Sequence, residues 1–229
     1  MIYMVKNGYL ITIEGISGVG KTIIGKELTQ LLEIDIGNVI FLGNFQTNKD
    51  SLLVQEINKY LSKDRFLRLN WERETALLIA ELLERIEEDV IVALSNGVTI
   101  IYECYINAII AYQSARLCEC NAIFKKYDNY VEYTRKIVAP FFKYVPEPDI
   151  QIFVNCSKNI IKKRLIKRDN RKYSLKDQKL QENINISYSK LYNDIHNILT
   201  IDTSRFSKEE LLNYVKALYR EEIKNKIKL

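Results

Sequence analysis

The stretch YLITIEGISGVGKTIIGKEL, residues 9–28, runs from an apolar segment into a glycine-rich loop that ends in Lys-Thr. From Gly15 to Thr22 it has the spacing Gly-x4-Gly-Lys-Ser/Thr. Glycines in such a loop let backbone N–H groups turn inward around phosphate oxygens, and a helix that begins directly after the loop points its positive end at the same place. The stretch therefore predicts a strand, a phosphate-binding loop and a helix in succession.

The predicted loop also carries two side chains with chemistry of their own. The Lys21 ammonium can reach the β- and γ-phosphates of a nucleoside triphosphate, and the Thr22 hydroxyl can bind Mg²⁺. We expect ATP with Mg²⁺ as the ligand, because a chance glycine turn would lack the strand before it and the helix after it. The expected ATP-binding residues of the loop are Gly15, Ile16, Ser17, Gly18, Val19, Gly20, Lys21 and Thr22.

Four further apolar runs indicate strands, and helical patterns lie between them. The runs are short, rich in Ile and Val and apolar on both faces, which is typical of a parallel sheet covered by helices. Strands alternating with helices predict an α/β fold, a three-layer sandwich around a five-stranded parallel sheet, in one domain over residues 1–229. The runs span 38–42, 98–102, 150–154 and 198–202, and the helical patterns span 21–33, 72–97, 157–168 and 207–226.

Three of these helical patterns carry end signals. Gly97 closes the pattern 72–97, as glycine does where a helix ends in a left-handed residue. Ser157 precedes the next pattern as an expected N-cap. Ser207 and Glu210 have the Ser-x-x-Glu spacing of a capping box, in which each side chain binds the other residue's backbone N–H.

The composition favours a small anionic ligand. Hydrophobic residues make up 47% of the 229 residues, which is ample for a core, and 34 Lys and Arg exceed 29 Asp and Glu by five. An excess this mild does not predict an extended nucleic-acid footprint. The sequence shows neither an apolar run of membrane-spanning length nor a secretory signal, so we expect a cytoplasmic protein without a membrane partner.

The cysteines and the single histidine do not predict a metal centre. Cys104, Cys118, Cys120 and Cys156 form no Cys-x-x-Cys pair. We expect reduced, buried thiols rather than a zinc site or a disulfide framework. His196 is the only histidine, which excludes a multi-histidine site.

The stretch IIYECYINAIIAYQSAR, residues 100–116, gives the chain a family resemblance. Together with the phosphate loop, over about residues 9–226, it resembles thymidylate kinase, a nucleoside monophosphate kinase family with the P-loop nucleoside triphosphate hydrolase/kinase fold. In that family the third strand ends in Asp-Arg-Tyr, and Ala-Tyr-Gln follows after a short gap. Here Glu103-Cys104-Tyr105 and Ala111-Tyr112-Gln113 stand in those places. The resemblance implies that Tyr105, Tyr112 and Gln113 bind the acceptor.

Several family residues are replaced in this chain. Ser17 stands where the family has an acidic loop residue, Cys104 stands for an arginine that faces the transferring phosphate, and Leu82 stands for an arginine that reads the base edge. A charged group aimed at a transferring phosphate commonly supplies several kcal/mol of transition-state stabilisation. The candidate replacements are Arg65, Arg68, Arg73 and Arg85.

Two further sets of residues are expected to take part in catalysis. Glu103 ends the third strand, where ligands bind in open α/β sheets, and can hold the metal through water or orient the acceptor. Arg164, Arg168 and Arg171 lie in a predicted lid, about residues 164–178, where arginine can stack on adenine and pair with phosphate. For Arg164 a solvated basic helix end is an equal alternative. The expected catalytic residues are Lys21, Glu103, Arg168 and Arg171, with Arg164 binding ATP.

The resemblance implies a nucleoside monophosphate kinase that transfers the γ-phosphate of ATP to a deoxynucleoside monophosphate, with dTMP as the first candidate acceptor. It also implies a homodimer. Two other functions stay open. One is a deoxynucleoside kinase of related fold, and the other is a nucleotide-binding protein that has lost catalysis.

Overall fold

The computed structural model describes residues 6–44, 50–60, 67, 69–120, 127–143, 145–170, 174–193 and 198–227. Five parallel strands form one sheet in the order β2-β3-β1-β4-β5, which confirms the predicted sheet. The strands are β1 Leu10–Glu14, β2 Val39–Leu42, β3 Thr99–Glu103, β4 Ile150–Asn155 and β5 Leu199–Asp202. Because β1 lies at the centre, the glycine-rich loop leaves the middle of the sheet at its carboxyl edge.

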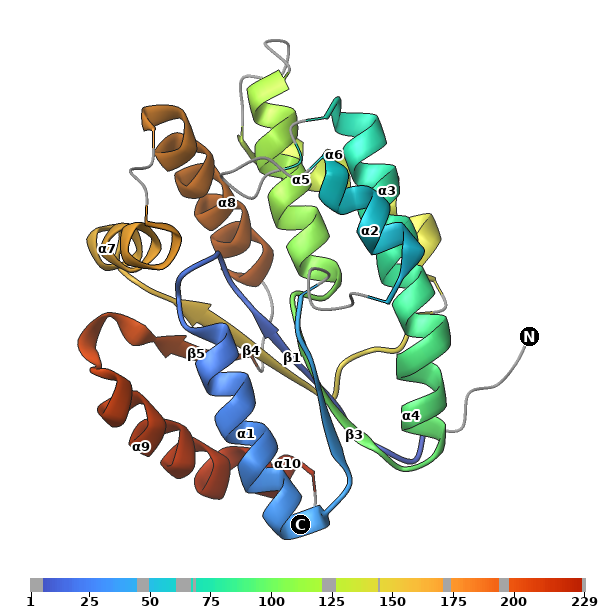
Figure 1. Cartoon of the computed structure of the whole chain (residues 1–229), viewed down its shortest axis with the longest axis vertical. Helices are drawn as coiled ribbons and strands as arrows, with labels where there is room; N and C mark the ends of the chain where they lie inside the picture. Colours follow the sequence, from blue (N-terminus) through green and yellow to red (C-terminus); the bar gives the residue numbers. More distant parts are fainter. Residues whose placement is uncertain are drawn as a thin grey trace.

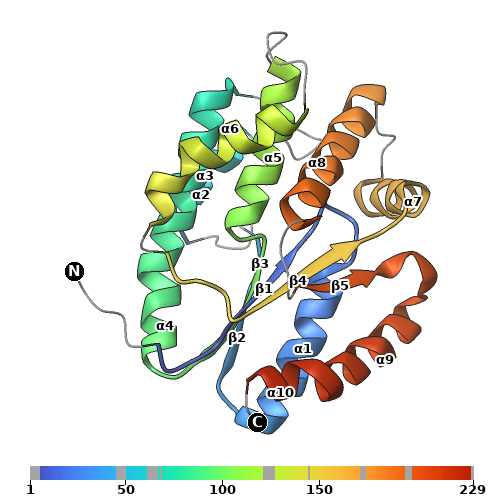
Figure 2. The same cartoon turned by 180° about the vertical axis from the view of Figure 1, so that it is seen from behind.

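Helices cover both faces of the sheet (Figures 1 and 2). On one face, α1 packs against α9, and on the other face α5 lies between α3 and α8. The helices are α1 Lys21–Ile36, α2 Leu52–Lys59, α3 Trp71–Arg85, α4 Ile91–Ser95, α5 Ile106–Cys120, α6 Tyr127–Val138, α7 Lys158–Asp169, α8 Leu175–Asn193, α9 Lys208–Leu218 and α10 Lys224–Lys226. Short 3₁₀ turns span Ala139–Phe142 and Thr203–Arg205, and π-helical turns span Ile86–Val90 and Tyr219–Ile223.

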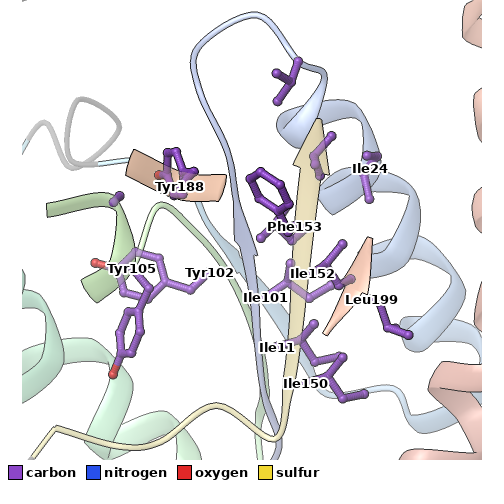
Figure 3. Close-up of a cluster of buried hydrophobic side chains, with 14 of the residues drawn as sticks. Ile11, Ile24, Ile101, Tyr102, Tyr105, Ile150, Ile152, Phe153, Tyr188 and Leu199 are labelled. Carbon is purple, nitrogen blue, oxygen red and sulfur yellow. The ribbon is translucent and has the colours of Figure 1, made fainter. Parts of the chain in front are cut away.

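The strands supply the centre of the core, with side chains on both faces (Figure 3). Ile11 and Ile152 are fully buried, as apolar strands between two helical layers must be. Ile24 of α1 packs on one side of the sheet, while Tyr102 and Tyr188 lie on the other. Burying one such side chain stabilises the fold by about 1.5–3 kcal/mol, so this cluster holds the layers together.

The predicted helix ends differ in how they are made. The pattern 72–97 forms α3, a π-helical turn and α4, and Gly97 follows in the left-handed region with φ 76°. Ser207 and Glu210 form the predicted capping box at α9. Ser157 stands at the N-cap of α7, but its side chain makes no capping hydrogen bond, which corrects the predicted cap. Its own backbone N–H donates to the Ser204 hydroxyl instead, at 2.6 Å.

The cysteines agree only in part with the predicted buried thiols. Cys104, Cys118 and Cys156 are free thiols, but Cys156 alone of these three is buried, and the other two are half-buried. His196 and the side chain of Cys120 lie outside the described residues. Within the described ranges, no group of three or more His, Cys, Asp or Glu residues is arranged to hold a metal ion. Nor is any described helix long and apolar enough to cross a membrane.

The two serine caps provide a matched pair for a stability measurement. We expect Ser207→Ala to lower the free energy of unfolding by about 1 kcal/mol, because a capping bond to the Glu210 N–H is lost. Ser157→Ala should cost less than about 0.5 kcal/mol, since no capping bond exists there. Urea denaturation of both variants checks this, and equal losses would contradict it.

Candidate active site

The glycine-rich loop wraps around the carboxyl end of β1 and leads directly into α1 (Figure 1). Gly15, Gly18 and Gly20 have φ values of 140°, 90° and 109°. Such values favour glycine, since a side chain there is strained. At Gly15 a Cβ atom would also lie 2.3 Å from the Val154 carbonyl oxygen of β4. The glycines therefore serve both the turn and its close approach to the next strand.

Lys21 is buried inside this loop. Its ammonium donates to the carbonyl oxygens of Gly15 at 2.9 Å and Ile16 at 3.1 Å, and it lies 3.7 Å from Glu103 Oε1. Burial opposes the charge, but the neighbouring acidic groups, Glu103 among them, outweigh burial and hold the pKa of Lys21 above its ordinary value. A cation is therefore held at the centre of the loop.

Thr22 and Glu103, the two predicted metal residues, meet at the carboxyl edge of the sheet. The Thr22 hydroxyl donates to Glu103 Oε2 at 2.8 Å, although 81 residues separate the two. A hydroxyl and a carboxylate are the oxygen ligands that Mg²⁺ prefers, and Mg²⁺ bound with a triphosphate usually takes only one or two protein ligands. This pair of oxygens at the start of α1 fits the expected ion.

A cavity of about 780 Å³ begins at the loop. One end lies against the loop, α7 and the start of α9, where Arg164, Ser207 and Leu211 line it. The other end lies between α3 and α5. Its walls there include Glu74, Leu78, Glu81, Leu82, Ala108, Ile109, Tyr112 and Gln113. The loop thus borders a single cavity that extends from α7 and α9 to the space between α3 and α5.

Two of the three predicted lid arginines reach the loop. Arg168 donates to the Ser17 hydroxyl at 3.0 Å and pairs with Asp169. Arg164 donates to the Val19 carbonyl at 3.2 Å and to the Thr203 hydroxyl at 3.0 Å, so it joins the loop to the end of β5. Arg164 is therefore a half-buried structural bridge that also lines the cavity.

The predicted lid is described only in part. Arg171 lies outside the described residues. Residues 164–169 belong to α7, whose Leu165 packs against the loop, and a Cβ atom at Gly18 would lie 3.0 Å from it. Closure of residues 164–178 over a ligand stays a prediction.

Tyr112 and Gln113 line the cavity, but the side-chain amide of Gln113 already forms hydrogen bonds to two residues of α3. It accepts from the Thr75 hydroxyl at 2.9 Å and donates to Glu74 Oε1 at 3.1 Å. The Tyr112 hydroxyl receives a hydrogen bond from the Ser17 backbone, and burial raises its pKa to about 12. Tyr112 therefore joins α5 to the phosphate loop, and Gln113 joins α5 to α3.

Tyr105 is not among the described residues that line this cavity, so its acceptor contact stays a prediction. Its ring packs beside Tyr102 in the core (Figure 3), with ring centroids 5.2 Å apart. Its hydroxyl donates to the Pro146 carbonyl at 2.9 Å. The reason is positional, since Tyr105 precedes the first turn of α5 and points into the sheet layer, whereas Tyr112 lies seven residues on, facing the loop.

Glu14, which the sequence analysis did not single out, is buried at the end of β1. It accepts from the Tyr105 backbone N–H at 3.0 Å and from the Tyr188 hydroxyl at 3.1 Å. Burial raises the pKa of Glu14 to about 7, against the lowering effect of the Tyr188 hydrogen bond and Lys21. A charged residue in an otherwise apolar strand was the signal in the sequence. Its contacts fix the starts of the loop and of α5 relative to α8.

Leu82 and Cys104, which stand where the family has arginines, both line the cavity. Leu82 is buried, and Cys104 adopts the left-handed backbone conformation with φ 67°. Burial raises the pKa of the Cys104 thiol to about 12, so the thiol is neutral at physiological pH. Neither residue supplies charge to the cavity.

Of the two candidate replacements that the structure describes, Arg85 is the one that lies at the site. It donates to the Gly43 carbonyl at 2.6 Å and lines a second cavity, about 450 Å³, together with Thr22 and Glu103. Arg73 instead stacks over the Tyr60 ring, 4.5 Å from its centroid. The remaining candidates, Arg65 and Arg68, lie outside the described residues.

Comparison with known proteins places this site in a family. The sequence model described as thymidylate kinase matches residues 13–215. A probable thymidylate kinase of Pyrococcus abyssi is 25% identical over 216 residues, which is 94% of this chain and 98% of the relative. A thymidylate kinase of Brachyspira hyodysenteriae is 27% identical over 212 residues, or 91% of this chain and 94% of the relative.

The solved structures that resemble this fold include thymidylate kinases as well. The solved structure of thymidylate kinase from Candida albicans superposes with a TM-score of 0.68 at 19% identity, covering 96% of this chain and 94% of that one. That from Ehrlichia chaffeensis gives a TM-score of 0.63 at 17% identity, covering 95% and 99%. With the family match spanning most of its length, the chain belongs to the thymidylate kinase family and is a phosphotransferase.

Proposed function

We propose that the protein transfers the γ-phosphate of ATP to a deoxynucleoside monophosphate, with dTMP as the acceptor to test first. The observation that carries the proposal is one continuous cavity, lined at one end by the phosphate loop and at the other by α3 and α5. Two reactants bound at these ends would meet beside Lys21. The family relationship extends the proposal to a cytoplasmic homodimer acting on nucleotides rather than on nucleic acid.

The loop would hold the donor. Its backbone N–H groups and the start of α1 provide an anion site for the phosphates. The Lys21 ammonium, which now binds the carbonyls of Gly15 and Ile16, would exchange them for phosphate oxygens. Thr22 and Glu103 would hold Mg²⁺, directly or through water, and the bound ion neutralises phosphate charge.

Arginines on two sides would position the transferring group. Arg168 already contacts the loop through Ser17, so a small movement of its fork would bring it to the phosphates. Arg85, beside Thr22 and Glu103 in the second cavity, is the described candidate for the charge that Cys104 no longer supplies. Phosphoryl transfer depends mainly on such positioning and neutralisation.

A deoxynucleoside acceptor is the second candidate function, and one observation favours it. Cys104 leaves the cavity wall without the positive charge that the family aims at the transferring phosphate, and a bare nucleoside brings no phosphate of its own to neutralise. Comparing turnover of thymidine and of dTMP by the wild-type protein separates the two acceptors.

Removal of the loop cation tests the proposal directly. We expect Lys21→Ala to lower ATP-dependent dTMP turnover by several orders of magnitude, because the charge on the β- and γ-phosphates is lost. Because Lys21 is buried and binds two loop carbonyls, the melting temperature should fall as well. Lys163→Ala, on the exposed face of α7, is the control and should leave ADP release unchanged. Unchanged turnover in Lys21→Ala would remove the loop from catalysis.

Two tyrosine variants separate the cavity wall from the core. Tyr112→Phe should raise the KM for dTMP severalfold, because its hydroxyl joins the cavity wall to the loop. Tyr105→Phe should leave that KM unchanged and lower the free energy of unfolding by about 1 kcal/mol, since the Pro146 carbonyl loses its donor. Steady-state kinetics with urea denaturation checks both, and a raised KM in Tyr105→Phe would return that residue to the acceptor site.

The altered strand-end motif provides a third test. We expect Cys104→Arg to raise kcat/KM for dTMP about tenfold or more, because a cation facing the acceptor phosphate is restored. Cys104→Gln, which adds length without charge, is the matched control. Thymidine turnover should not gain from the arginine. An equal gain for thymidine would show that the effect is not one of phosphate neutralisation.

A further inference from the structure

Glu81 is a buried carboxyl group, and one of its two oxygens has no hydrogen-bond partner among the described residues. Its side chain is 6% exposed and lines the cavity on the same face of α3 as Leu78 and Leu82. Within the described part of the chain, Glu81 Oε1 has no hydrogen-bond partner. The nearest cationic atom is Arg85 Nε at 3.8 Å, beyond hydrogen-bonding distance. A buried polar group left in this way costs about 1–3 kcal/mol, which a ligand that binds it would recover.

The other polar side chains that α3 and α5 turn toward the cavity already have partners. The Gln113 amide binds Thr75 and Glu74. Glu74 Oε1 accepts from Gln113, and its Oε2 accepts from Arg116 at 3.3 Å. The Tyr112 hydroxyl receives the Ser17 backbone hydrogen bond. Among the buried side-chain oxygens of α3 and α5 that the structure describes, Glu81 Oε1 is therefore the one without a hydrogen-bond partner.

The surroundings of Glu81 suit a planar ring. Leu78 and Leu82 on α3, with Ala108 and Ile109 on α5, form apolar walls of the same cavity end. Apolar side chains on two sides accept the faces of a nucleobase, which leaves its polar edge to be paired. Glu81 is in reach of that edge because it lies between Leu78 and Leu82 on one helix face.

We propose that Glu81 binds the edge of the acceptor base as a neutral carboxyl group, its carbonyl oxygen accepting from thymine N3–H and its O–H donating to thymine O4. A neutral carboxyl group satisfies any edge that offers one donor beside one acceptor, as thymine does. Glu81 thus contacts the base edge from the position next to Leu82, which stands where the family has its base-reading arginine and has no polar group. This inference rests on the proposed function for the identity of the ligand.

The neutral form is the one that the surroundings of Glu81 favour at mildly acidic pH. Burial raises its pKa to about 7, Arg85 lowers it and Glu84 raises it. Tyr102 of β3 also faces Glu81. The further charged or titratable side chains of the cavity are Glu74, Glu103, Lys21, Arg164, Lys167, Arg168, Lys208, Cys104 and Tyr112. Because the neutral form is present below the raised pKa and is lost above it, base binding should weaken as pH rises through about 7.

Calorimetric titration of the full chain with dTMP, without ATP, tests this at about pH 6 and about pH 8.5. From the lower to the higher pH, the affinity of the wild type for dTMP should fall about tenfold or more beyond any fall seen for Glu81→Gln. The reason is that a carboxylate has no proton to donate to O4. Glu81→Gln should bind almost equally at both, because its amide keeps one donor and one acceptor. The phosphate of dTMP titrates at about pH 6 whichever variant is used, so comparing the variants removes the effect of phosphate titration on the measured affinity.

Two further variants complete the design. Glu81→Ala should bind dTMP about tenfold more weakly than the wild type at the lower pH, which corresponds to about 1.4 kcal/mol. Glu88→Gln, an exposed substitution in the π-helical turn after α3, removes the same kind of charge and should follow the wild type at both pH values.

The outcomes separate this inference from the proposed function. Absence of dTMP binding by the wild type, identical pH dependence in the wild type and Glu81→Gln, or Glu81→Gln as weak as Glu81→Ala, would each overturn the role of Glu81. Binding with the expected pH dependence but without ATP-dependent turnover of dTMP would support Glu81 and overturn the proposed transfer.

Discussion

The contact of the Lys21 ammonium with the carbonyl oxygens of Gly15 and Ile16 is the interaction on which the rest of the site depends. It closes the loop around its own cation, and it does so because α1 begins at Lys21, directly after the last loop glycine. The loop leaves the central strand of the sheet, so the ends of β3 and β4 lie on either side of it. Glu103 and the Val154 carbonyl thus reach the loop without any irregularity in the sheet.

Glu14 explains how the helices are held around this loop. A carboxyl group buried at the end of the central strand must have donors, and it takes one from Tyr105, directly before α5, and one from Tyr188 of α8. That requirement draws Tyr105 toward the sheet and into the core. The contact with the phosphate loop then falls to Tyr112, two helical turns later, whose hydroxyl meets the Ser17 backbone. The partners of Glu14 therefore help to set which side of α5 faces the loop.

The proposed acceptor end, between α3 and α5, differs from the family pattern in its charged residues. Where the family has arginines, this chain has Leu82 and a neutral Cys104, and the wall between α3 and α5 carries Glu74 and Glu81 instead. Glu74 is compensated by Gln113 and Arg116, so it acts as a structural link between the helices. Glu81 is not compensated by a hydrogen bond within the described residues. Glu81 is proposed to replace the base contact of the arginine that the family has at Leu82. Arg85 is proposed to replace the charge of the arginine that the family has at Cys104.

Much of the fold and the donor half of the site could be predicted from the sequence, because they depend on local pattern. Five short apolar runs specified the parallel sheet, and glycine spacing specified the loop that turns into α1. The capping box at Ser207 is also local, since its two partners are three residues apart. Such features need no information about distant parts of the chain.

The partners of individual side chains were decided only by the tertiary structure. Ser157 has the sequence of a cap, yet its side chain forms no capping bond, while its backbone binds Ser204, 47 residues away. The residue types at Arg164, Tyr105 and Glu81 do not by themselves determine whether each side chain binds a ligand, packs in the core or has no hydrogen-bond partner. Their roles depend on which segments, far apart along the chain, the sheet brings within hydrogen-bonding distance. Local pattern specifies where an element lies, and packing between elements specifies which of its polar groups remain free for chemistry.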